Sequence, residues 1–213
     1  MYKRQGKDSD YVSDMVSYKG SSDYLFAEGN VVTQYVDEKT LDLLKIKSEK
    51  LESYISKELV EFNGHVKGSL RRKKIYEGGL KFFADKVKLN SPESLLELIS
   101  NVEIYRNNYY LRSGTAQIFL ENYNKKLKYY ALYDDVKLEE KMKLSSGETQ
   151  LRRAFSEKLE GVRSTGQIIL TGAPRVEQGA DIIKGYQITL RENTELIEVD
   201  DAQSRFQVNK DKK

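Results

Sequence analysis

The chain has 213 residues, enough for one large domain or two small ones, and its formal net charge of +3 combines both signs without a concentrated basic face, which excludes a typical nucleic-acid binder. It has no cysteine and a single histidine, His65, which excludes disulfides, thiolate metal sites and histidine-rich zinc sites. Seven phenylalanines and fifteen tyrosines argue against disorder.

The first residues carry charged and polar side chains with no apolar run behind them. Residues 1–10 are therefore expected to be a disordered segment, and they contain neither an export signal nor a membrane anchor. If the protein is exported, the sequence is that of a processed form.

An internal repeat organises the rest of the chain. Five times a small, turn-forming segment leads into a valine: Gly29-Asn30-Val31, Gly64-His65-Val66, Ser100-Asn101-Val102, Asp134-Asp135-Val136 and Ala173-Pro174-Arg175-Val176. Successive valines are 35, 36, 34 and 40 residues apart. Repeats of this size indicate one supersecondary unit stacked on copies of itself. We expect one elongated domain over residues 11–206, without a linker, and a disordered charged tail over residues 207–213.

Each repeat also predicts a segment centred on a small residue, followed by a polar turn. The small-residue segments are expected at Lys47-Ser48, Phe83-Ala84, Ser113-Gly114, Ser146-Gly147 and Lys184-Gly185. The turns are expected at Ser56-Lys57-Glu58, Ser91-Pro92-Glu93, Asn122-Tyr123-Asn124, Ser156-Glu157-Lys158 and Glu192-Asn193-Thr194.

The segments between these turns read mostly as strands. Apolar and polar residues alternate in 81–89, 102–105 and 116–120, and three such runs at 167–171, 182–190 and 195–199 predict a meander. In the second of these runs, Ile182, Tyr186, Ile188 and Leu190 are expected on one side. The pattern predicts antiparallel β structure with roughly 15 to 18 strands of about 5 to 8 residues.

Two stretches also fit a helix. Leucine and isoleucine residues within 41–59 are spaced like one helical face, as are Leu151, Phe155 and Leu159. Strands are favoured in both, because a helix there would break the repeat on either side of it.

The sequence offers no catalytic constellation. His65 lies at a repeat turn without a nucleophile motif, and no Gly-Lys-Ser/Thr follows Gly161 and Gly166. Neighbouring acids at Asp134-Asp135 and Asp200-Asp201 would point to opposite faces of a strand, so they read as solvated turns. We therefore expect no enzyme, no metal and no cofactor.

Two surface features each allow two interpretations. The basic runs at 71–74 and 125–128 could contact phosphates or could belong to soluble loops and protected sheet edges. The tyrosines between 105 and 133 could form an amphipathic surface or pack across strands.

The repeat motifs carry a resemblance. Residues 27–34, with the sequence Ala-Glu-Gly-Asn-Val-Val-Thr-Gln, and residues 169–179, from Ile-Leu-Thr-Gly-Ala-Pro to Val-Glu-Gln-Gly, followed by Ile183 to Leu190, resemble the OstA-like family of the lipopolysaccharide transport machinery. The resemblance covers most of the chain. It is strongest over 167–199 and weakest over 139–163.

The resemblance implies an incompletely closed antiparallel β-jellyroll of two facing sheets that is repeat-built and all-β. It further implies a periplasmic bridge protein that shields the acyl chains of lipid A and passes lipopolysaccharide from the inner to the outer membrane. Its partners would be lipopolysaccharide and other jellyrolls at both edges, with head-to-tail self-association possible and no nucleic acid. Three alternatives stay open: the periplasmic domain of the inner-membrane-anchored component, the N-terminal domain of the outer-membrane component, and a lipid-free β-repeat scaffold or adhesin.

If the resemblance holds, the alternation of apolar and polar residues along the strands predicts which side chains face inward and would contact lipid. These side chains are Phe83, Val87, Leu89, Ile104, Ile118, Leu120, Ile168, Leu170, Ile188 and Leu190. The expected partner edges are Tyr24–Gln34, including Tyr24, Phe26, Val31 and Val32, and Thr194–Val199, including Leu196, Ile197 and Val199.

Overall fold

The computed structural model describes residues 2–5, 9–36, 41–73, 79–106, 108–121, 126–144, 147–191, 194 and 196–205. Within these ranges the chain forms seventeen antiparallel strands joined in one sheet, with no α-helix. The strands are β1 (Tyr2–Gln5), β2 (Ser9–Ser13), β3 (Met15–Lys19), β4 (Tyr24–Val36), β5 (Leu43–Tyr54), β6 (Leu59–Arg71), β7 (Leu80–Asn90), β8 (Leu95–Arg106), β9 (Tyr109–Glu121), β10 (Lys126–Lys143), β11 (Thr149–Val162), β12 (Gln167–Thr171), β13 (Arg175–Gln178), β14 (Asp181–Lys184), β15 (Gln187–Arg191), β16 (Ile197–Asp200) and β17 (Gln203–Arg205). Two short 3-10 turns, η1 (Gly20–Ser22) and η2 (Ile55–Lys57), join strands at one side.

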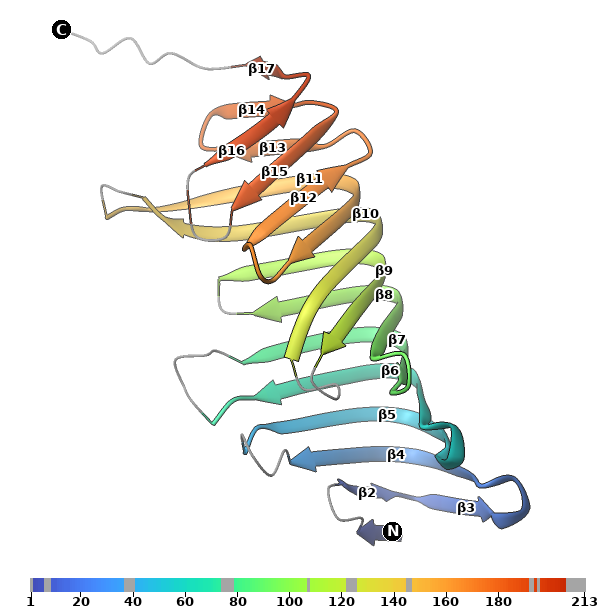
Figure 1. Ribbon diagram of the computed structural model, residues 1–213. Coiled ribbons are helices and arrows are strands. Elements are labelled where there is room, and N and C mark those ends of the chain that lie inside the picture. Colours follow the sequence, from blue (N-terminus) through green and yellow to red (C-terminus); the bar gives the residue numbers. More distant parts are fainter. Residues whose placement is uncertain are drawn as a thin grey trace, which may run out of the picture.

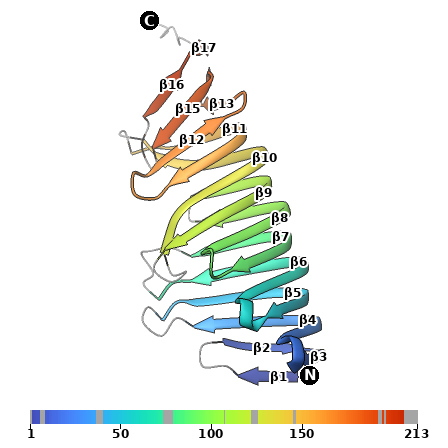
Figure 2. The same cartoon turned by 45° about the vertical axis from the view of Figure 1, so that its right-hand side comes forward.

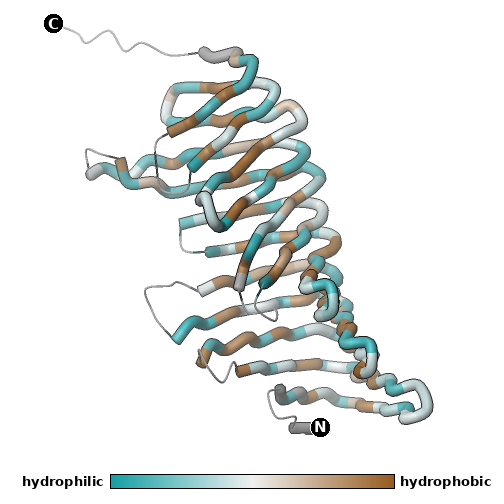
Figure 3. The backbone as a smooth tube through the Cα atoms, in the orientation of Figure 1, coloured by the Kyte–Doolittle hydropathy of each residue, from teal (hydrophilic) through white to brown (hydrophobic). Residues whose placement is uncertain are grey.

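The strands stack along one axis, with β1–β3 at one end and β16 and β17 at the other (Figures 1 and 2). The predicted fold class, an unclosed antiparallel β-jellyroll, is confirmed. Apolar and polar positions alternate along the strands (Figure 3). The predicted strand length is wrong for the long strands β4–β11, because each of them runs through a bend instead of ending at it.

Those bends fold the single sheet into two layers. Register shifts interrupt the pairing near the middle of the strands from β4 to β11. Layer A contains β3, β12, β15, β16 and the limbs of the long strands on the side of η1 and η2. Layer B contains β1, β2, β13, β14, β17 and the other limbs (Figure 2).

The turn pairs of the repeat form half of these corners. In each of five pairs both residues have a positive φ, from 43° to 81°: Gly29-Asn30, Gly64-His65, Ser100-Asn101, Asp134-Asp135 and Gly172-Ala173. Two successive left-handed residues interrupt the pleat and redirect the strand, which explains why glycine, asparagine and aspartate recur there. A side chain on Gly64 would collide with Glu49 of the neighbouring corner. The first four predicted pairs thus lie inside strands, as corners, whereas the fifth corner lies between β12 and β13 at Gly172-Ala173, one residue before the predicted Ala173-Pro174.

Buried serines form the alternate corners, except on β7, where buried Ala84 takes that place. The hydroxyls of Ser13, Ser48, Ser113 and Ser156 each donate to the carbonyl two residues further on, at 2.9 to 3.0 Å. The expected register of the fourth unit is wrong, because its corner lies at Ser156 and not at Ser146-Gly147. The layer B limb of β10 extends to Lys143 and delays the next corner.

One apolar row runs through the whole of layer A. Cross-strand partners place the following residues side by side from β3 to β16: Val16, Ala27, Leu51, Phe62, Val87, Leu98, Ala116, Leu132, Leu159, Leu170, Ile188 and Val199. We call this the inner row. All its members are buried except the two terminal valines, which are half-buried.

The expected N-terminal edge is wrong. Strand β4 pairs with β2 and β3 on one side and with β5 on the other, so Tyr24, Phe26, Val31 and Val32 lie within the sheet. Residues expected to be disordered supply the added strands, since 2–5 form β1 and 9–10 begin β2. At the other end, Ile197 and Val199 lie in β16, which pairs only with β15 among the described strands.

The remaining ambiguous stretches are strands. Residues 43–54 form β5 and residues 149–162 form β11, so the helical spacing of their leucines does not produce a helix. The expected strand over 182–190 is broken by a corner at Gly185, which turns Ile182 outward while Ile188 and Leu190 face the core. The expected turn at 122–124 and the tail from 206 lie outside the described residues.

Candidate functional site

The inward side chains of β5–β9 leave an apolar strip half-buried at the free margins of the two layers. In layer B these are Leu44, Leu70 and Leu80, which pair across β5, β6 and β7. In layer A they are Val60, Leu89, Leu96 and Ile118, which pair across β6 to β9. We call these seven residues the open margin. Five of them pack against the buried core: Leu44, Val60, Leu80, Leu96 and Ile118.

The corresponding layer A positions on β11, β12 and β15 are sealed, whereas Tyr130 of β10 and Ile197 of β16 lie in the same row and are half-buried. Ile168 and Leu190 continue the layer A margin and are 1% and 0% exposed. In layer B the row of Leu44 continues to Glu140 and Arg152, both 0% exposed, and Met142 beyond them is 1% exposed. The apolar interior is therefore half open over β5–β9 and closed at β11, β12 and β15.

A charged pair lies inside the sealed part. Glu140 of β10 and Arg152 of β11 are direct cross-strand partners, and both are 0% exposed. The Arg152 Nε donates to Glu140 Oε2 at 3.0 Å, and its Nη2 donates to the same oxygen. Buried charges need such partners, because unpaired ions lose hydration without compensation.

The arginine also reaches the opposite layer. Its Nη1 donates to the carbonyl of Thr194 at 3.0 Å, and its Nη2 to the carbonyl of Arg191 at 3.4 Å. Arg191 ends β15 of layer A, whereas Arg152 belongs to layer B. One side chain thus bonds to both layers.

The structure divides the ten residues nominated for lipid contact. Leu89 and Ile118 belong to the open margin, and Leu120 is half-buried on the same face. Val87 and Ile104 are buried in the core behind that margin. Ile168, Leu170, Ile188 and Leu190 lie in the sealed part.

Phe83 is the one nominated residue on the wrong face. The corner at Ala84-Asp85 shifts the alternation by one residue, so Phe82 and Ala84 face the core and Phe83 faces outward. Its ring lies 5.9 Å from that of Tyr105, edge to face. Tyr105 in turn packs on its cross-strand partner Tyr110 at 4.8 Å. At these positions the tyrosines are explained by packing across strands.

Hydrogen bonds fix two of these outer tyrosines. The Tyr105 hydroxyl donates to Glu103 at 2.8 Å, and this bond, with burial and the carboxylate charge, raises the pKa of Tyr105 to about 12. Burial and a hydrogen bond to Glu160 raise the pKa of Tyr129 further. Both phenols stay protonated at neutral pH and serve as donors.

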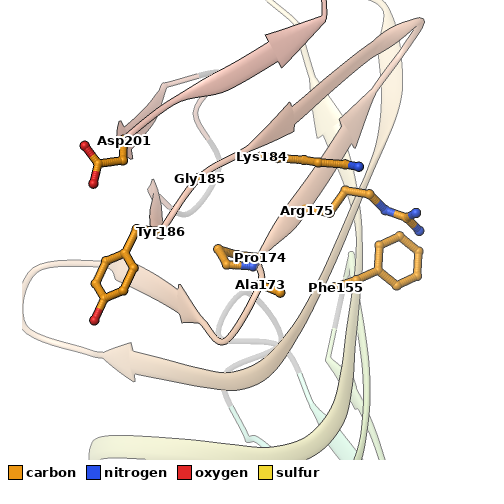
Figure 4. Close-up of a pocket in the computed structure, with 8 residues that line it drawn as sticks. All are labelled: Phe155, Ala173, Pro174, Arg175, Lys184, Gly185, Tyr186 and Asp201. Atoms are coloured by element: carbon orange, nitrogen blue, oxygen red, sulfur yellow. The ribbon is translucent and has the colours of Figure 1, made fainter.

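The outer corner carries two shallow hollows of about 570 and 560 Å³, which share Phe155 and Ala173. In the first, drawn in Figure 4, Arg175 stacks 4.5 Å from the Phe155 ring centre and lies beside its cross-strand partner Lys184. None of the nominated residues lines either hollow. Basic side chains and Asp201, Asp134 and Glu157 share their walls, so neither sign of charge dominates.

Sequence reasoning missed the whole layer B margin and the charged pair. Leu44 was hidden in a stretch with helical spacing, and Leu70 directly precedes a basic run. Alternation of Leu96 and Leu98 was a usable signal for layer A. The pair had no such signal, because glutamate and arginine are expected at the surface.

The fold and margin define an unclosed antiparallel β-jellyroll with an apolar interior. A family model described as LptA/(LptD N-terminal domain) LPS transport protein matches residues 81–196. The chain belongs to this family, as the repeat motifs predicted.

A solved structure supports the fold. The chain is similar to LptH, described as the LptA homologous periplasmic component of the conserved lipopolysaccharide transport device from Pseudomonas aeruginosa, with 12% identity and a TM-score of 0.56. The similarity covers 62% of this chain and 97% of LptH. The sequence has no significant match among curated proteins.

Two further classes of site were sought among the described residues. No cluster of histidine or acidic side chains there is placed to hold a metal ion. None of the helices in the described ranges has the length and apolarity needed to span a membrane.

Proposed function

We propose that the protein is a periplasmic lipopolysaccharide-binding bridge component whose open margin shields the acyl chains of lipid A. The observation that carries this proposal is the strip of half-buried apolar residues over β5–β9 in a member of a lipopolysaccharide-transport family. Covering such a strip with acyl chains removes apolar surface from water, which is favourable by about 25 cal/mol per Å². The sugars would stay outside, in water. The proposal assigns the protein no chemical step.

We also propose that jellyrolls join head to tail through layer A. The inner row ends at Val16 of β3 and Val199 of β16, and both side chains are half-buried. A second jellyroll stacked there would bury both valines and continue the row. Edge strands with unpaired backbone groups commonly recruit such partners.

Strand direction favours layer A over layer B for this joint. Layer A runs through twelve strands from β3 to β16, each antiparallel to the next, so its two edges point in opposite directions. Stacked copies would therefore pair them antiparallel. Layer B runs through thirteen strands from β1 to β17, so its edges point the same way. Parallel pairing is slightly less stable per residue.

Photo-crosslinking tests the lipid role. A photo-reactive residue at inward Ile118 should capture lipopolysaccharide from intact envelopes, whereas one at outward Gln117 should not. The two positions are neighbours on β9, so accessibility along the strand is matched. Equal capture at both would contradict the proposed face, and no capture at either would favour a lipid-free scaffold.

A proline substitution tests the edge. Ile197→Pro removes a backbone donor from β16 and should abolish association with a second jellyroll while leaving circular dichroism unchanged. Ile197→Val keeps the donor and the branched side chain and is the matched control. Unchanged association of a folded Ile197→Pro protein, measured by size exclusion and crosslinking, would contradict the proposed joint.

A further inference from the structure

The charged pair occupies the same inward row as the layer B margin. Leu44, Leu70 and Leu80 are cross-strand partners on β5–β7, and the row continues through half-buried Arg106 of β8 and Tyr109 of β9 to Glu140 and Arg152. The first three side chains are apolar and form no polar bond to layer A. At Arg152 the row bonds to layer A through two carbonyls. The row changes from half-buried to sealed at Glu140 and Arg152.

The bonding pattern of Arg152 needs both layers together. Glu140 accepts from Nε and Nη2, which compensates the carboxylate charge within layer B. The guanidinium still points donors towards layer A, and these are satisfied at Thr194 and Arg191. If the layers separated here, two buried donors and two carbonyls would lose their partners. Leaving buried polar groups unpaired is costly, so the pair favours the closed arrangement.

We infer that Glu140 and Arg152 form a cross-tie that closes the two layers and ends the lipid compartment at β10. Lipid is then confined to β5–β9, and transfer through the C-terminal end requires the tie to break. The lipid part of this inference rests on the proposed function. The closure itself does not, and it is testable without lipid.

Cysteine labelling measures the closure directly, because the chain has no cysteine of its own. Leu190→Cys reports on the sealed part and Leu96→Cys on the open margin. A maleimide should modify Leu96→Cys at least ~10-fold faster than Leu190→Cys, since the sealed residue reacts only after local opening. Equal rates in the otherwise unaltered protein would overturn the closure without any change to the tie.

A double substitution then removes both residues of the cross-tie. Glu140→Met with Arg152→Met leaves no unpaired buried charge, and such replacements are commonly tolerated. Labelling of Leu190→Cys should rise at least ~10-fold in this background, while that of Leu96→Cys should not change. An unchanged rate at Leu190→Cys in a folded double variant would overturn the tie.

The same two strands supply the control. Glu139 and Arg153 are also cross-strand partners, 3.5 Å apart, but they lie on the outer face and are partly exposed. Glu139→Met with Arg153→Met makes the same chemical change one residue away. It should leave Leu190→Cys labelling unaltered, and an equal increase there would overturn a specific role of the inner pair.

Lipid capture completes the test. A photo-reactive residue at Ile168 should capture no lipopolysaccharide with the tie intact and should capture it in the Glu140→Met, Arg152→Met variant. Capture at Ile118 should occur in both. Failure at Ile118 would contradict the proposed function while leaving the labelling result intact, whereas capture at Ile168 with the tie intact would overturn the compartment boundary.

Discussion

Strands β5–β9 and strands β10–β16 share corners and the buried inner row, and they differ at the margin. The last inward residues are half-buried leucine, valine and isoleucine in layer A over β6–β9 and half-buried leucines in layer B over β5–β7. On β11, β12 and β15 the equivalent layer A positions are buried, while Tyr130 of β10 and Ile197 of β16 stay half-buried. In layer B, Glu140 and Arg152 occupy the row that holds leucine on β5–β7. The two regions therefore differ in how far their margin residues are covered.

The corner architecture explains how this difference is tolerated. All corners of the long strands except that of β7 are satisfied locally, by two left-handed residues or by a serine that bonds two residues further on. The margin therefore contributes little to holding the bend. A repeat fold with local corners can vary its margin from unit to unit, as nearest-neighbour stacking permits.

The largest difference in stability between the two regions should come from replacing only one residue of the cross-tie. Arg152→Met strands the Glu140 carboxylate in the sealed part and should lower the free energy of unfolding by about 3–5 kcal/mol. Arg153→Met, on the outer face, should cost less than about 1 kcal/mol. Urea denaturation of both variants measures the difference, and similar midpoints would show that the inner pair is not buried in solution.

Matched leucine truncations should sharpen the comparison. Leu190→Ala in the sealed part should cost about 2–5 kcal/mol, because it leaves a cavity. Leu96→Ala at the open margin should cost only about 1 kcal/mol, because part of that side chain is already in water. Equal losses in chemical denaturation would mean that the margin is closed in solution.

Much of this architecture could be predicted from the sequence, and the corners show why. Gly29-Asn30 and Gly64-His65 favour a left-handed backbone, so their recurrence along the chain is enough to identify the repeat. The inward or outward assignment on one side of a corner could not be extended to the other side, because one extra residue at the corner shifts the alternation. Phe83 was misplaced for that reason, whereas Val87 and Leu89, beyond the same corner, were assigned to the inward face that they occupy.

The candidate site was less predictable. Burial depends on which residues lie opposite across the two layers, and alternation within one strand does not report this. It could not separate Ile118, at the open margin, from Ile168, in the sealed part. The N-terminal edge was missed because residues 2–19, rich in polar side chains, add strands outside β4.

A charge at the open margin should reduce lipid capture with little effect on folding. Leu96→Asp places a carboxylate where acyl chains would lie and should lower capture at Ile118 by ~10-fold or more, because a bound chain would desolvate it. Glu97→Gln, on the outward face of the same strand, is the control. Undiminished capture in Leu96→Asp envelopes would place the lipid elsewhere.

Lowering the pH should reduce the free energy of unfolding slightly, and by similar amounts through the outer faces of the two regions. Burial opposes ionisation of Glu61, but the hydrogen bond and charge of Lys86 outweigh it and, with Lys88 3.6 Å away, hold the pKa of Glu61 below its ordinary value. The hydrogen bond from Tyr129, together with Lys158 at 3.0 Å, does the same for the pKa of Glu160 against the effect of burial.

Lowered pKa values stabilise the fold above the ordinary carboxyl pKa of about 4.3, and this contribution is lost as the pH falls through the folded values. Glu61→Gln and Glu160→Gln should therefore each lower the urea midpoint slightly at pH 7 and converge with the unaltered protein near pH 3. A clear effect in one region alone would show that the outer faces differ as the margins do.

The most direct test is a crosslinking profile along the layer A margin. Photo-reactive residues placed singly at Val60, Leu89, Leu96, Ile118, Ile168 and Leu190 sample the same inward row from β6 to β15. We predict capture of lipopolysaccharide at the first four positions and a sharp loss at Ile168 and Leu190. Capture that is uniform along the row, or strongest at Ile168 and Leu190, would contradict a lipid compartment confined to β5–β9.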